Sequence, residues 1–167
     1  MKKYLVILFA VLCQFSYAQF VPDYDQIKLQ HPTDYKQSEK FALNAANYLL
    51  TTPYEKENAI RNRTLQFLLK WMNGTPDYGF TMEGVSGKII KGNNDLMALY
   101  MASMVKYSLD NKSSADLNLV RLNAIKILLA YCENPANNIK MTKGLKKLSE
   151  ANKKGELEKA VAEAAGA

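Results

Sequence analysis

Histidine and cysteine are nearly absent from this chain, and their scarcity argues against several kinds of site. The 167 residues include one histidine, His31, and two cysteines, Cys13 and Cys132. A zinc site needs several His or Cys ligands, and a calcium loop needs more closely spaced aspartates than Asp23 and Asp25 supply. No catalytic motif flanks His31, so we expect it at the surface. The sequence predicts no metal site, no cofactor and no catalytic residue.

The chain also lacks an apolar run long enough to cross a membrane. Its one long run, residues 4–12, is far shorter than the roughly 20 residues that a span needs. Lys2 and Lys3 precede the run, and the small residues Ser16 and Ala18 follow it. This order is typical of a cleavable signal peptide over residues 1–18, with a retained anchor as the less favoured alternative. We expect an exported protein, periplasmic or extracellular, without a membrane span after cleavage.

Cleavage would leave Cys132 as the only cysteine of the mature chain. Leu12 stands before Cys13, where lipoprotein signals need a small residue, so lipidation is not predicted. No intramolecular disulfide can then form, and the apolar helix end around Cys132 favours a core cysteine over an intermolecular bridge or a reactive thiol. Loss of two lysines lowers the formal charge from +6 to +4, and this mild excess predicts no nucleic-acid partner.

The remaining 149 residues form a single domain by length, and their apolar spacing is helical. We expect an all-α fold, a compact antiparallel helix bundle of four main helices with a weaker C-terminal helical pair. Residues 19–36 read as an irregular lead-in packed by Phe20, Tyr24 and Ile27. Residues 37–138 form the helical core, and residues 139–167 form a basic helical tail.

Helix boundaries follow from local end signals. The first helix is expected over 37–50. Thr52, Pro53 and Glu55 make a capping box that predicts the start of the second, which ends at residues 73–74. The third runs from 94 to about 109, capped by Asn93 or Asn94. The fourth follows a serine cap at 113 or 114 and stops at Asn134-Pro135.

The C-terminal tail is rich in lysine and poor in apolar residues. Met141, Leu145 and Leu148 give a modest stripe, and residues 156–165 form an alanine-glutamate helix with little to bury. Seven lysines and three glutamates lie between residues 140 and 159. We interpret this run as a solvated helical face. A surface for anionic lipid or polysaccharide is the alternative.

One long glycine-rich loop, residues 73–93, is the candidate binding site. It holds five of the eight glycines of the chain. Loops of this length without secondary structure are often functional. Aromatic rings beside carboxylates can contact sugars or peptides, so the candidate contact residues are Trp71, Asp77, Tyr78, Phe80 and Glu83. The alternative is a plain connection whose aromatic side chains lie in the core.

Phosphate binding and glycan hydrolysis are two further roles to compare with the residues of this loop, and the first is not predicted. Residues 84–88 lack the first glycine and the final serine or threonine of a phosphate loop. Asp77 and Glu83 could serve as acid and base of a glycan-acting hydrolase, which would require their carboxyl groups to face each other across a cleft. This hydrolase is the alternative function.

Residues 67–80 (FLLKWMNGTPDYGF) and 131–137 (YCENPAN), with the signal ending in Ala18-Gln19, resemble segments of small exported helical proteins of Bacteroidota. The resemblance implies export and an all-helical fold, and it assigns no activity and no functional residue. The sequence therefore favours an exported, non-catalytic binding or adaptor module of the periplasm or cell envelope. Its expected partner is an envelope protein or a glycan. A helper in the folding of larger envelope assemblies is a further alternative.

Overall fold

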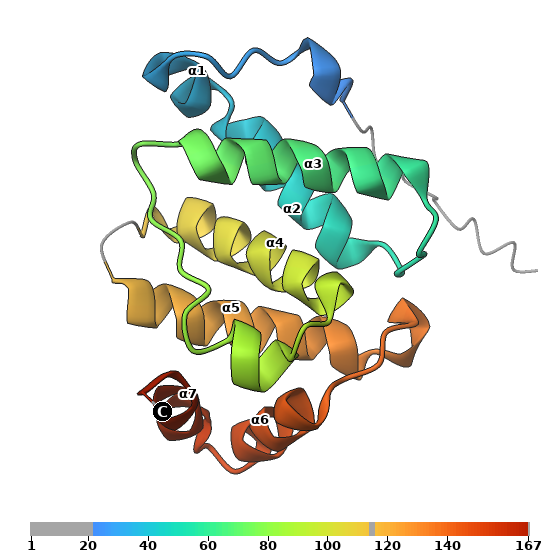
Figure 1. The fold of residues 1–167 in the computed structure, drawn as a ribbon, viewed down its shortest axis with the longest axis vertical. Helices are drawn as coiled ribbons and strands as arrows, with labels where there is room; N and C mark the ends of the chain where they lie inside the picture. Colours follow the sequence, from blue (N-terminus) through green and yellow to red (C-terminus); the bar gives the residue numbers. More distant parts are fainter. Residues whose placement is uncertain (1–21, 114–115, 167) are drawn as a thin grey trace, which may run out of the picture.

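Helices stack one upon another along the length of the molecule. The computed structural model describes residues 22–113 and 116–166, and within these ranges it contains helices and no strand. Helix α3 (Ala59–Gly74) packs on α2 (Glu39–Thr51), α2 on α4 (Asn94–Asn111), and α4 on α5 (Leu117–Glu133). The pair α6 (Lys143–Lys153) and α7 (Leu157–Gly166) packs on α5 and ends the stack (Figure 1). The prediction of an all-α bundle is confirmed. The predicted signal peptide, residues 1–18, lies outside the described residues.

Helix α4 lies at the centre because it is apolar on opposite faces. Ala102 and Val105 belong to the core shared with α2 and α3. Leu99 and Met104 belong to the core shared with α5, α6 and α7. A helix buries its apolar faces against neighbouring elements, so a helix with two apolar faces packs on both sides. This one helix therefore joins the two cores of the stack.

Helix α3 begins later than its capping-box pattern predicts. The cap is Asn58, whose side chain accepts a hydrogen bond from the Arg61 backbone N–H at 2.9 Å. Thr52 instead ends α2, and its hydroxyl donates to the Tyr48 carbonyl at 2.7 Å. The backbone N–H of Tyr54 donates to the carbonyl of Asn137 at 3.0 Å, a contact far along the chain. The predicted start at residue 53 is wrong because tertiary contacts hold this segment as a loop.

The predicted N-terminal cap is confirmed for α4 and wrong for α5. Asn93 caps α4 as predicted, and its side chain accepts from the N–H groups of Asp95 and Leu96 at 3.0 Å each. Asp116 caps α5 through the N–H groups of two residues of the first turn. The serine cap predicted at 113 or 114 is therefore wrong. An ionised aspartate is an equally good cap and favours the positive end of the helix.

The segment expected as an irregular lead-in is partly helical. It contains the 3₁₀ turn η1 (Tyr24–Gln26) and the short helix α1 (Pro32–Gln37). The carboxylate of Asp34 accepts from the His31 N–H at 2.9 Å, which fixes the start of α1 beside Pro32. Tyr24 stacks on Phe67 with ring centroids 4.4 Å apart. Phe20 lies outside the described residues.

The C-terminal helices bury more than their sequence suggests. Leu145 and Leu148 of α6 are buried, and so are Leu157 and Val161 of α7, all within the core that contains α5. The expectation that residues 156–165 have little to bury is wrong. Gly155 makes the turn between the two helices with a φ of +75°, a value that glycine adopts without strain.

The second half of the glycine-rich loop is a packed element. Residues Ser86–Ile90 form the π-helical turn η2, which follows buried Val85. Ile89 and Ile90 are also buried and join the core of α4, α5, α6 and α7. The loop is therefore irregular between α3 and η2 and over residues 91–93, which lead into α4. Within the described ranges, no helix has both the length and the apolar character that crossing a bilayer requires.

Candidate functional site

Trp71, the first of the predicted contact residues, lies inside the molecule. It has no exposed surface, and its indole N–H donates to the backbone carbonyl of Tyr35 at 2.9 Å. A buried indole normally needs such a partner. Trp71 therefore ties α1 to α3 and offers no area to a ligand.

The aromatic rings of the loop pack onto this tryptophan. The ring centroids of Tyr78 and Phe80 lie 5.9 and 6.3 Å from that of Trp71, in tilted geometry. Both side chains are half-buried and pack against the core of α2 and α3. Burial also raises the pKa of Tyr78. This arrangement matches the alternative in which the loop aromatics lie in the core.

The two loop carboxylates remain at the surface. Asp77 and Glu83 are both exposed, the first just after α3 and the second just before the turn that leads into η2. They are available to a partner from solution. Their role as acid and base of a glycan-acting hydrolase stays a prediction.

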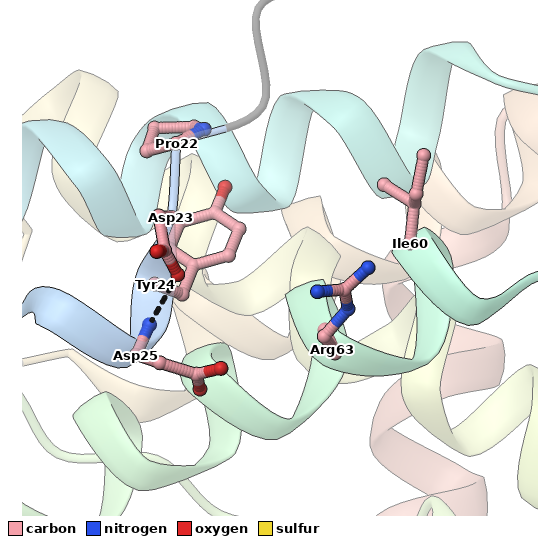
Figure 2. A pocket seen from close by; sticks show the side chains of 6 residues that line it. All are labelled: Pro22, Asp23, Tyr24, Asp25, Ile60 and Arg63. Carbon is pink, nitrogen blue, oxygen red and sulfur yellow. Dashed lines mark hydrogen bonds between the residues drawn. The ribbon is translucent and has the colours of Figure 1, made fainter.

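A shallow cleft lies between η1 and α3 and has a volume of about 360 Å³. Figure 2 shows Asp23 at the start of η1 and Asp25 within it, with Ile60 and Arg63 on α3. The carboxylate of Asp23 accepts from the Asp25 N–H at 3.2 Å, so it serves the turn itself. Two acidic side chains and one arginine line the cleft. Because both signs of charge are present, the cleft does not favour a ligand of one particular charge.

A second concavity has one dominant charge and a larger volume, about 730 Å³. It lies between η2, the start of α6 and one face of α7, and we call it the basic groove. Four lysines line it: Lys88, Lys91, Lys143 and Lys147. The rest of its lining comprises Ile89, Thr142, Gly144, Leu148, Ala160, Glu163 and Ala164. Lysines from two distant parts of the chain thus meet over a largely apolar floor.

The basic groove exists because η2 docks closely on the first turn of α6. The hydroxyl of Thr142 donates to the carbonyl of Ile89 and accepts from the Leu145 N–H at 3.1 Å. A Cβ added to Gly144 would lie 2.6 Å from the carbonyl oxygen of Lys88 and 2.8 Å from the Cα of Ile89. Only glycine fits against this backbone. The close approach brings Lys88 and Lys91 to the lysines of α6.

Charge in the basic groove is unbalanced. All four lysines are exposed, and among the described residues of the lining Glu163 alone is acidic. Around an apolar floor, such an arrangement attracts anionic groups and orients them. The lysine-rich tail in the sequence indicates the two lysines of α6, although a solvated face is the favoured interpretation of that run. The sequence does not predict the two lysines at η2, because nothing in the loop indicates that it docks on α6.

The scarce metal-ligating and nucleophilic residues lie apart from this groove. His31 is exposed and precedes α1. Cys132 is buried as predicted, and burial raises its thiol pKa from 9.0 to about 12. Within residues 22–113 and 116–166, no three His, Cys, Asp or Glu side chains gather closely enough to hold a metal ion.

Comparison with known proteins finds no family model, no curated protein and no solved structure that matches this chain. The chemistry of its own residues therefore carries the functional argument.

Proposed function

We propose that this protein is an exported, non-catalytic binding or adaptor module of the periplasm or cell envelope. We further propose that it binds its partner through the basic groove, to which residues 88–91 of the glycine-rich loop contribute, rather than through the first half of that loop, residues 73–83. The observation that carries the proposal is the meeting of four exposed lysines over an apolar floor. Concave sites with an apolar floor and a few polar groups are the usual form of binding sites in proteins.

The geometry of residues 73–83 favours the basic groove over this first half of the loop as the contact surface. Trp71 is buried, and Tyr78 and Phe80 pack on it, so three of the five predicted contact residues serve the core. Asp77 and Glu83 are exposed, but none of the three aromatic candidates, Trp71, Tyr78 and Phe80, is an exposed side chain. The basic groove, by contrast, exposes all four of its charged lysines.

Export is the part of the proposal that rests on sequence alone. Lys2 and Lys3, the apolar run 4–12 and the small residues before Gln19 support it. Recovery of the protein from the envelope or medium with Gln19 as its first residue is the expected result. Recovery from the cytoplasm with residues 1–18 intact would contradict export.

Site-specific photo-crosslinking in cells tests the binding surface. A photo-reactive amino acid replaces Lys91 in the groove, Asp77 in the first half of the loop or Lys70 on α3, all three exposed positions. We expect a defined adduct from position 91 alone, and we expect the charge reversals Lys143→Glu and Lys147→Glu to abolish it. An adduct from position 77 alone would restore residues 73–83 as the contact surface. Equal adducts from all three positions would refute a specific surface.

A further inference from the structure

The floor of the basic groove sets the shape of what can bind there. Ala160 and Ala164 lie one turn apart on α7 and both line the groove, with buried Leu148 of α6 also in the lining. Alanine side chains are short, so they leave room above this part of the floor. The aliphatic stems of the surrounding lysines add apolar walls beneath their charged ends. A ligand that fills the groove therefore has apolar groups between its acidic ones.

A membrane surface does not fit this shape. Peripheral helices bind membranes by inserting large apolar side chains below the headgroups. Among the described residues, the exposed large apolar side chains are Ile60, Leu117 and Leu119, and none of them lines the groove. The groove is a concavity, and a flat bilayer surface is not complementary to a concave floor.

An acidic glycan fits less well for a different reason. Sugar rings are commonly bound by flat aromatic side chains that contact their faces. Among the residues that the structure describes, none that lines the basic groove is aromatic. Its floor consists of small and branched aliphatic side chains, which suit the apolar side chains of a polypeptide.

We infer that the basic groove binds an acidic peptide segment of a partner protein. Carboxylates of the segment pair with the lysines, and its small apolar side chains lie against Ala160 and Ala164. This inference rests on the proposed function and adds the chemical class of the partner. Because the charged ends are exposed, we expect binding to weaken as salt screens them.

Fluorescence anisotropy with the full mature protein tests the inference. The probes are labelled peptides in which glutamates flank alanine and leucine, and matched peptides with glutamine in place of glutamate. Vesicles containing phosphatidylglycerol and soluble polygalacturonate are the competing probes. We expect saturable, salt-sensitive binding of the glutamate peptides only.

Two sets of variants separate the groove from overall charge. Lys143→Glu with Lys147→Glu is expected to weaken peptide binding about tenfold or more, because two attractive pairs become repulsive. The control Lys70→Glu with Lys126→Glu makes the same change in net charge at exposed positions on α3 and α5, and it is expected to leave binding unchanged. Ala160→Leu fills the floor without altering charge and is expected to weaken binding by a similar factor. Circular dichroism confirms the folding of each variant.

The outcomes also separate this inference from the function on which it rests. Lysine-dependent binding of the vesicles or of polygalacturonate instead of the peptides would overturn the acidic-peptide class. So would equal loss of peptide binding in the two double variants. A groove-specific crosslink in cells, together with no binding of the acidic peptides, would leave the binding module standing and refute only the class of partner.

Discussion

The hydroxyl of Thr142 caps helix α6 and at the same time donates a hydrogen bond to the carbonyl of Ile89 in η2. One side chain thus fixes the start of a helix and the turn that docks upon it. The lysines of the basic groove lie on either side of this contact. The arrangement of the four lysines therefore depends on the contact between η2 and α6.

Removing that hydroxyl should weaken the junction. Thr142→Ala loses both hydrogen bonds, and loss of a helix cap costs about 1–2 kcal/mol of unfolding free energy. Urea denaturation measures the effect. Thr142→Ser is the matched control and should retain most of the stability, because a serine hydroxyl can make both hydrogen bonds. Equal stability of the alanine variant and the wild type would contradict the role of this contact.

The glycine that faces η2 gives a second test of the same junction. In Gly144→Ala, the added methyl group would meet the backbone of Lys88 and Ile89 at 2.6–2.8 Å. Backbone cannot move aside as a flexible side chain can, so we expect a loss of about 1–3 kcal/mol. Gly87→Ala in η2 is the control, since nothing lies within 4 Å of its added Cβ. Thermal unfolding that ranks these two variants in the opposite order would refute the close approach.

Arg61 is the side chain that joins α3 to the end of α2. It is 6% exposed, and its guanidinium donates to the Leu49 carbonyl at 2.8 Å and to the Thr52 hydroxyl at 2.9 Å. Arg61→Ala leaves these acceptors without their donor in a buried site, so we expect a loss of about 2–3 kcal/mol. Arg63→Ala, an exposed neighbour, should change stability by less than about 0.5 kcal/mol. Denaturation curves that do not separate the two variants would contradict this role.

Burial of the Cys132 thiol predicts loss of stability at alkaline pH. The folded protein raises the thiol pKa from 9.0 to about 12, so above pH 9.0 the unfolded chain loses this proton first. The protonated thiol therefore makes its full contribution to the free energy of unfolding below pH 9.0, and this contribution falls as the pH rises towards about 12. Tyr100 acts in the same direction, because burial raises its pKa from 10.0 to about 12.

Urea denaturation at about pH 8 and about pH 11 measures this loss, and Cys132→Ala should reduce the difference between the two values. A thiol-specific disulfide reagent should also react slowly with the native protein and rapidly with the unfolded one. Fast labelling of native Cys132 would contradict the buried thiol.

The sequence predicted well where local chemistry decides the structure. The all-α class, the Asn93 cap and the stop at Asn134-Pro135 agree with the structure, and so does the buried Cys132. Each of these depends on residues close together in the chain or on helical periodicity. Local signals were sufficient for them.

Long-range contacts decided the features that the sequence did not predict. The capping box at residues 52–55 does not start a helix, because Arg61 contacts the end of α2 and Tyr54 contacts Asn137. Trp71 looked like a surface residue at the mouth of a loop, yet its partner is the carbonyl of Tyr35 on another helix. The sequence indicates only two of the four lysines of the basic groove, because the other two are brought there by the docking of η2 on α6.

Binding of an acidic peptide in the basic groove is tested most directly by mapping the contact surface residue by residue. Amide chemical shifts of the isotope-labelled mature protein are recorded by NMR as the acidic glutamate-alanine-leucine peptide is added. We expect the largest changes at Lys88, Lys91, residues 143–148 and residues 160–164, and we expect them to vanish in the Lys143→Glu, Lys147→Glu variant. Changes centred on residues 77–83, or no saturable change at all, would contradict it.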